Sequence, residues 1–89
     1  MRREPDFFGD QELELVYIAK RLRDALRLEE VLTKAGVDYL VETDTYRGGI
    51  IFASDRVGAF FYVSPESAEP IRNIMRENRY KPYVVLGNG

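Results

Sequence analysis

The stretch Ala59–Met75, with the sequence AFFYVSPESAEPIRNIM, decides the fold because it joins a strand directly to a helix. Its first five residues are aromatic, β-branched or alanine, which is typical of a strand that ends at Val63. Ser64 then offers a hydroxyl group to cap a helix, Pro65 suits the first helical position, and Glu66 places an acid in the first turn. We therefore expect a helix to begin at Pro65, immediately after the strand.

The apolar residues of this helix recur at helical spacing and predict its extent. They are Ala68, Ile71, Ile74 and Met75. The pattern predicts a helix over residues 65–78 that frays near Asn78. If the Ser64 hydroxyl caps this helix, Ser64→Ala should cost on the order of 1 kcal/mol.

A similar strand and helix occupy the first half of the chain. Glu12–Ala19 alternates acidic and apolar residues before an apolar run, which predicts a strand. Asp24 is positioned to cap a helix, and Gly36 is a typical residue just beyond a helix end. The apolar residues at helical spacing between them are Ala25, Leu28, Val31, Leu32 and Ala35. We expect this helix over residues 24–35.

Further strand-like segments lie between the two helices. Val37–Thr43 alternates like a strand and leads into the turn-rich segment Asp44–Gly49. Ile50–Ala53 and Ala59–Val63 are both strand-like. The segment Ser54–Gly58 between them fits either a turn or a bulge within one bent strand.

Tyr83–Leu86 completes the pattern as a short last strand before a Gly-Asn-Gly tail. The order of strand, helix, strand, strand, helix, strand is the ferredoxin-like βαββαβ pattern. The sequence thus predicts an α+β fold with a four-stranded antiparallel sheet and both helices on one face. A chain of 89 residues suffices for one core, so we expect a single domain over residues 12–87, with a leader at 1–11 and a tail at 88–89.

The composition limits the chemistry that the protein can perform. Cysteine and histidine are both absent, which removes disulfides, thiolate chemistry, the usual general base and the usual metal ligands. No metal site, cofactor or catalytic residue is therefore expected. The net charge of -2 and the pI of about 5.1 argue against a broad attraction to nucleic acid or an anionic membrane, although local basic patches are compatible with both values. No segment resembles a signal peptide or a membrane span, so we expect a cytoplasmic protein.

The sheet face without helices is expected to be apolar, because the strands carry apolar side chains on both faces. A large patch of this kind is rare in a monomer. A second copy of the chain is one candidate to cover it, which gives a symmetric homodimer. The interface would include Tyr17, Tyr39, Phe60 and Tyr62. The N-terminal leader, which contains two phenylalanines, is the other candidate.

An RNA-binding domain is an alternative, because RNA-recognition domains share this topology and stack bases on aromatic side chains of the sheet. Val16–Ala19 resembles the first-strand motif of that family, and Arg56 with Ala59–Phe61 fits the third-strand motif in part. However, Val57 and Gly58 stand where that motif has a glycine followed by an aromatic residue. The acidic balance also supplies little surface to neutralise phosphates, so nucleic acid is not the expected partner.

Basic residues cluster where the first strand meets the first helix. They are Lys20, Arg21, Arg23 and Arg27. A helix N-terminus with nearby arginines can hold a small anion, although a solvated basic helix edge has the same pattern. Arg21 and Arg23 are our candidate ligand-binding residues there. Arg47 with Gly48 and Gly49 is a second candidate, since glycines let backbone amides approach a ligand, although a plain hairpin turn also uses such residues.

The same basic junction resembles that of acylphosphatases, which share this topology and bind phosphate with an arginine. Their loop is rich in glycine and a strand asparagine positions the attacking water. Here the loop is not glycine-rich, and the asparagines are Asn73, Asn78 and Asn88, on the second helix or the tail. A phosphate-handling enzyme is therefore a third hypothesis, which those residues do not support.

Apolar, glycine and capping residues between Glu14 and Asn78 form a longer pattern. It comprises Leu15–Ile18, Asp24, Ala25, Leu32, Ala35–Val37, Gly48, Gly49, Phe61–Val63, Pro65, Glu66, Ala68 and Ile74. The pattern resembles a bacterial family of unknown function whose members are described as prokaryotic signal-transducing proteins. The resemblance implies a ferredoxin-like domain and supplies no active site. We therefore expect a non-enzymatic regulatory module that binds a small anionic ligand or a protein and acts as a homodimer.

Overall fold

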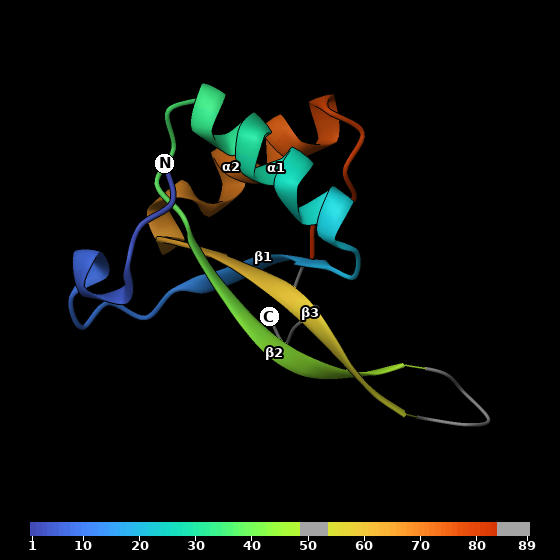
Figure 1. The fold of residues 1–89 in the computed structure, drawn as a ribbon. Coiled ribbons are helices and arrows are strands. Elements are labelled where there is room, and N and C mark those ends of the chain that lie inside the picture. The colour runs from blue at the N-terminus through green and yellow to red at the C-terminus, as the bar shows by residue number, and fades with distance from the viewer. Residues whose placement is uncertain (49–53, 84–89) are drawn as a thin grey trace, which may run out of the picture.

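The computed structural model describes residues 1–48 and 54–83. In this part of the chain, two α-helices pack on one face of a three-stranded antiparallel sheet (Figure 1). The elements are a 3-10 helix Pro5–Phe8, β1 Glu14–Ala19, α1 Leu22–Lys34, β2 Leu40–Gly48, β3 Ser54–Val63 and α2 Pro65–Glu77. The α+β class predicted from the sequence is thereby confirmed.

β3 is the middle strand of the described sheet, with β1 on one side and β2 on the other. β2 pairs with β3 in a continuous register that places Val41 opposite Phe61. β1 pairs with the second half of β3, and its register shifts by one residue between Leu15 and Tyr17, as at a β-bulge. Because β1 and β2 both run antiparallel to β3, they are parallel to each other, and α1 connects them.

The core lies between the sheet and the two helices. Its largest fully buried side chains are Val16, Leu28, Leu32, Tyr39, Phe61, Val63, Ile71 and Met75. Phe61 of the middle strand stacks on Tyr39, with the ring centroids 5.9 Å apart. Burial of one such side chain is worth about 2 kcal/mol relative to leaving it exposed, so this layer holds the helices on the sheet.

α1 begins at Leu22, and its N-cap is Arg21 rather than the predicted Asp24. Asp24 lies in the first turn, where an acidic side chain interacts favourably with the helix dipole. At the other end the prediction is confirmed. Gly36 follows the C-cap Ala35 with a φ of 75°, which glycine adopts without strain, and backbone bonds close the helix in the pattern of a Schellman motif.

β2 begins later and extends further than the predicted strand Val37–Thr43. Val37 still donates a hydrogen bond back to α1, and the backbone of Tyr39 pairs with the N-terminal residues, so neither belongs to the ladder with β3. The segment Asp44–Gly49, predicted as a turn, is a strand as far as Gly48 because pairing with β3 satisfies its backbone groups. The turn prediction was wrong for residues 44–48.

β3 is one continuous strand, so Ser54–Gly58 does not form the turn that the sequence allowed. The predicted strand Ile50–Ala53 lies outside the described residues, as does all of the predicted strand Tyr83–Leu86 except its first residue. The backbone nitrogen of Tyr83 donates a hydrogen bond of 2.6 Å to the carbonyl oxygen of Val16 on β1. The chain that follows α2 therefore reaches β1.

α2 ends within one residue of its predicted boundary, and Ser64 is its N-cap residue. The side chain of Ser64 does not cap the helix in the described structure, contrary to the prediction. Its hydroxyl group instead donates to Oε1 of Gln11 at 2.9 Å, which holds the segment before β1 against the start of α2. The proline at the first helical position is as predicted.

Arg72 is only 8% exposed, although its position three residues after Glu69 is typical of an ion pair on the solvated surface of a helix. That pair is present at 3.5 Å, and the guanidinium also lies 3.2 Å from Oε2 of Glu14 on β1. Its Nε donates to the carbonyl oxygen of Tyr83. These partners satisfy the buried charge and tie α2 both to β1 and to the segment that follows the helix.

The N-terminal leader packs near the start of β2. Arg2 forms a parallel bridge with Tyr39, and the backbone nitrogen of Arg3 donates to the carbonyl oxygen of Tyr39 at 2.8 Å. Phe7 is 52% exposed; its ring packs edge to face on Phe8 and lies under the guanidinium of Arg3. Phe7 therefore does not provide the apolar cover considered for the open sheet face.

Candidate anion-binding site

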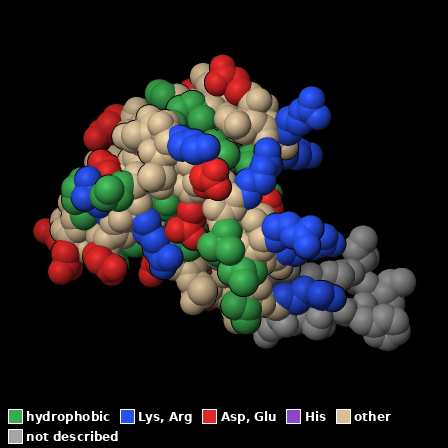
Figure 2. Space-filling model, turned by 45° about the horizontal axis from the view of Figure 1, so that its top comes forward, with side chains coloured by type: hydrophobic (Ala, Val, Ile, Leu, Met, Phe, Trp, Pro, Cys, Tyr) green, Lys and Arg blue, Asp and Glu red, His purple; other side chains and the backbone are tan. Residues whose placement is uncertain are grey.

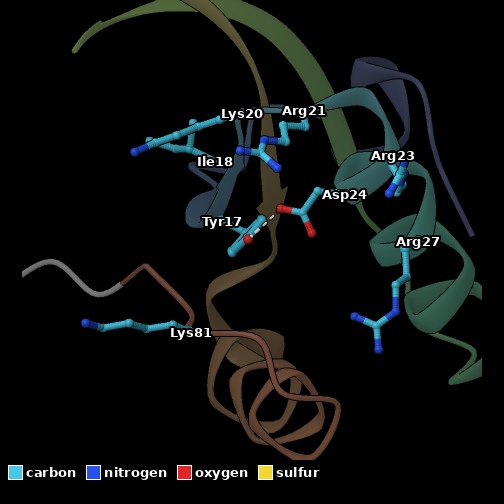
Figure 3. Close-up of a pocket in the computed structure, with 8 residues that line it drawn as sticks. All are labelled: Tyr17, Ile18, Lys20, Arg21, Arg23, Asp24, Arg27 and Lys81. Carbon is cyan, nitrogen blue, oxygen red and sulfur yellow. Dashed lines mark hydrogen bonds between the residues drawn. The ribbon is translucent and has the colours of Figure 1, made fainter. Parts of the chain in front are cut away.

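A cleft of about 810 Å³ opens where β1 runs into α1, at the basic cluster found in the sequence. It is lined by Tyr17, Ile18, Lys20, Arg21, Arg23, Asp24, Arg27 and Lys81 (Figure 3). The end of β1 and the first two turns of α1 supply most of these residues. Lys81 comes from the segment after α2. The cleft thus joins three parts of the chain.

The path of the chain at the junction explains why basic side chains surround the cleft. β1 ends at Ala19, and Arg21 keeps an extended backbone, with φ -132° and ψ 144°, before α1 begins. Arg21 is the N-cap residue, but its side chain does not bond to the backbone amide groups at the start of α1. Arg23 and Arg27 are one turn apart on α1, so they lie on the same side of the helix.

The lining of the cleft is strongly cationic. Five of its eight residues are lysine or arginine, and Asp24 is the one acid among them, which leaves a formal charge of +4 in a chain of net charge -2. Across residues 1–48 and 54–83, no ion pair joins Arg21, Arg23, Arg27 or Lys81 to a carboxylate. Figure 2 shows basic side chains gathered toward the side on which α1 begins in Figure 1.

Tyr17 and Asp24 form a hydrogen-bonded pair among these cations (Figure 3). The hydroxyl group of Tyr17 donates to Oδ2 of Asp24 at 2.7 Å. Burial raises the pKa of Tyr17 well above the usual tyrosine value, and the bond to Asp24 raises it further. Tyr17 therefore stays protonated at neutral pH and keeps one oxygen of the Asp24 carboxylate engaged.

Aromatic contacts hold the side of the cleft nearest the end of α2. The guanidinium of Arg27 lies over the ring of Tyr80, 5.0 Å from its centroid, and the rings of Tyr80 and Tyr17 meet edge to face at 5.2 Å. Tyr80 is buried and directly precedes Lys81. Packing of the Tyr80 ring in the core therefore brings the Lys81 side chain to the cleft.

Sequence reasoning found four of the five cations because they are close neighbours in the chain. It missed Lys81, which reaches the cleft only through the tertiary packing of Tyr80. It also predicted Asp24 to be a helix cap and Tyr17 to lie on the open sheet face. No local signal in the sequence connects these two residues with each other.

For the second candidate, Arg47 with Gly48 and Gly49, the structure describes the backbone of the first two residues. Arg47 and Gly48 are the last two residues of β2, and their backbones pair with Asp55 and Ser54 of β3. Gly49 lies outside the described residues. The described backbone of Arg47 and Gly48 continues a strand, and the ligand-binding role suggested for the three residues stays a prediction.

The four residues predicted to share the open sheet face lie on two different faces. Tyr39 is 1% exposed and bonds to the hydroxyl of Thr33 on α1, and Tyr17 packs on Tyr80, so both lie on the helix side. The bulge in β1 explains the error for Tyr17, because one extra residue reverses the alternation of faces. The strand pairing places five residues on the helix-free face: Leu15, Ile18, Leu40, Phe60 and Tyr62.

Comparison of the chain with protein-family models, with curated proteins and with solved structures finds no match. The resemblance to the bacterial signal-transducing family therefore stays a prediction. In the part of the chain that the structure describes, neither α-helix is long and apolar enough to cross a membrane.

Proposed function

We propose that the protein is a non-enzymatic regulatory module that binds a small, multiply charged anion, such as a phosphate ester, in the cleft between β1 and α1. The observation that carries this proposal is the formal charge of +4 on the lining of one cleft in an acidic chain. Like charges held close together repel one another and disfavour the folded state. A bound anion offsets this repulsion. A requirement for solubility alone would not explain why the basic residues line one cleft.

The residue types in the cleft suit a phosphate group. The guanidinium of an arginine presents paired donors that match two phosphate oxygens, and Arg21, Arg23 and Arg27 each offer one. The positive end of the α1 dipole lies at the same junction and favours negative charge there. Ile18 and the ring of Tyr17 add apolar surface to the lining, which a larger organic ester can contact.

We assign recognition rather than turnover to this site because its two non-cationic polar groups are already engaged. Tyr17 stays protonated at neutral pH, so it offers no phenolate nucleophile, and its bond occupies one oxygen of Asp24. The other carboxylate oxygen can accept a hydrogen bond from a hydroxyl or amino group of the ligand. Asp24 would in this way favour an anion that carries such a group over a bare inorganic ion.

We also propose that the complete chain has the ferredoxin-like topology, with Tyr83–Leu86 as a fourth strand beside β1. The hydrogen bond from Tyr83 to Val16 supports this placement, since it is a contact of the kind that begins a strand pairing. The order β1-β3-β2 is compatible with the proposed topology. The resemblance to signal-transducing proteins supports a regulatory role for such a domain.

We propose, in addition, that the helix-free face of the sheet joins two copies of the chain. Of the four residues predicted for this interface, Phe60 and Tyr62 remain at the centre of the proposed contact, because only these two of the four lie on the helix-free side. Phe60→Glu should then convert a dimer to a monomer in analytical ultracentrifugation. A native protein that sediments as a monomer at micromolar concentrations would contradict the dimer and leave the anion site unaffected.

Titration of the protein with pyrophosphate tests the anion site, with calorimetry and amide chemical shifts as readouts. We expect Arg23→Gln to weaken binding about tenfold, the loss of one charge-assisted contact. Lys34→Gln is the matched control because Lys34 is on the same helix but pairs with Glu30 on the surface, 3.2 Å away. Absence of binding, or equal losses in both variants, would show that the cleft is not the site. Hydrolysis of acetyl phosphate by the native protein would favour the enzyme hypothesis instead.

A further inference from the structure

Two leucines of α1 project from the protein instead of joining its core. Leu22 is 75% exposed and Leu26 is 56% exposed. They are one helical turn apart, so their side chains are neighbours on the surface. The core face of α1 is made by Ala25, Leu28 and Leu32. The two exposed leucines are thus not required for packing the helix on the sheet.

Basic residues adjoin these leucines in the sequence. On the helix surface Leu26 also neighbours Glu29 and Glu30, each of which is already paired with a cation, Arg2 and Lys34 respectively. The segment Lys20–Arg27 has the sequence KRLRDALR, in which arginines flank Leu22 on both sides and another follows Leu26. We call this segment the α1 docking segment. It is both apolar and cationic, a combination typical of helices that lie on a membrane surface.

The shape of the docking segment indicates the kind of partner. Neither leucine lines the cleft at the β1–α1 junction, and both protrude from the convex surface of a helix. A folded protein partner would need a pocket shaped for each leucine. The deformable interface of a lipid bilayer accepts protruding apolar groups without such pockets, while its anionic headgroups attract nearby lysine and arginine.

A second copy of the chain is a poor occupant of this surface. In a symmetric contact centred on Leu22 and Leu26, the same patch of each copy faces its partner. The arginines at positions 21, 23 and 27 of one copy would then approach those of the other, and like charges across an interface are unfavourable. The charge pattern therefore favours an anionic partner.

We propose that the α1 docking segment binds reversibly to anionic lipid bilayers, with Leu22 and Leu26 entering the interfacial region and the adjacent cations contacting lipid headgroups. The net charge of -2 does not prevent this, because salt screens charges farther away than about 8 Å at physiological ionic strength. The proposal goes beyond the binding of a soluble anion, since it depends on two leucines that lie outside the cleft. Membrane contact would place the proposed anion site next to the lipid surface.

Flotation with phosphatidylcholine vesicles that contain about one third phosphatidylserine tests the proposal. We expect the native protein to float with these vesicles at low salt and to be released from them by high salt. It should not bind to vesicles of pure phosphatidylcholine. The double variant Leu22→Gln, Leu26→Gln should bind at least tenfold more weakly while keeping the helix, because glutamine is a good helix former. Phe7→Ser is the control, since Phe7 is exposed to a similar degree but lies far from α1 in the chain.

Circular dichroism and pyrophosphate binding of the double variant separate this proposal from the preceding one. Native helicity and unchanged pyrophosphate affinity, together with lost flotation, would support a lipid surface formed by the leucines. Failure of the native protein to float, or equal flotation of native protein and double variant, would overturn it. Retention of the native protein on polyglutamate, but not on vesicles, would assign the surface to an acidic protein partner and also overturn it.

Discussion

The hydroxyl group of Tyr17 on β1 lies 2.7 Å from Oδ2 of Asp24 on α1 and donates a hydrogen bond to it. This bond joins the end of a strand to the first turn of the following helix, at the wall of the basic cleft. Asp24 is not the helix cap, because α1 begins two residues earlier at Leu22 and Arg21 has the extended backbone of the N-cap. The pair therefore links the first turn of α1 to the end of β1 at the proposed anion site.

Tyr17→Phe should destabilise the protein by about 1 to 2 kcal/mol, because it removes a hydrogen bond to a charged acceptor at a partly buried site. The ring contact with Tyr80 is retained in this variant, so packing is little changed. Urea denaturation measures the loss. A double-mutant cycle with Asp24→Ala isolates the bond, and a coupling energy near zero would show that the two side chains do not interact in solution.

Stability should fall at alkaline pH because burial raises the pKa of several tyrosines. The affected residues are Tyr17, Tyr39, Tyr62 and Tyr80. Their folded pKa values lie above the unfolded value of 10.0, so the unfolded chain releases its protons first. The stabilising effect is complete below that value and is lost as the pH rises through it toward the folded pKa values.

Denaturation midpoints measured on both sides of the tyrosine pKa check this expectation. The decline should be shallower in Tyr17→Phe, since Tyr17 has a strongly raised pKa and this variant removes its titration. Identical slopes for the native protein and the variant would mean that Tyr17 titrates normally in the folded state.

Arg72→Met should lower the free energy of unfolding by about 2 to 3 kcal/mol, more than a substitution that removes either of its carboxylate partners. The guanidinium is buried and bonds to the carbonyl oxygens of Tyr83 and Leu15, which lose a donor when it is removed. The side chain of Glu14 is 45% exposed, so its ion pair with Arg72 is partly solvated. Glu14→Gln, which removes this pair, should lower the free energy of unfolding by less than about 1 kcal/mol. Denaturation with guanidinium chloride compares the stabilities of the two variants. Equal losses would contradict the prediction that the bonds of Arg72 to the backbone contribute more than its ion pair with Glu14.

The helices and the middle strand could be predicted from sequence because their signals are local. Gly36 fixes the end of α1 through its backbone conformation, and the Val63–Pro65 junction fixes the end of β3 and the start of α2. The bulge in β1 could not be foreseen, because Leu15–Ile18 is apolar at every position and carries no alternation that sets a face. That single extra residue decides where Tyr17 points.

The candidate site was predictable only where its residues are neighbours in the chain. Arg21 and Arg23 were found for this reason, and the structure places both in the cleft. Lys81 reaches the cleft because Tyr80 is buried, and Arg72 is buried because β1 and the segment after α2 supply its partners. Both placements depend on tertiary packing, which the spacing of residues along one helix does not encode.

Ser64→Ala should cost only about 0.5 kcal/mol, less than the loss of a helix cap. Its hydroxyl makes no bond to the amide groups of α2 and instead donates to Gln11 at an exposed position. The extended backbone of Ser64 and the proline that follows it still start the helix in the variant. Denaturation of Ser64→Ala, Gln11→Ala and the double variant tests this, because the effect of Ser64→Ala should vanish once Gln11 is gone. A loss of about 1 kcal/mol that persists without Gln11 would instead show that the hydroxyl caps α2 in solution.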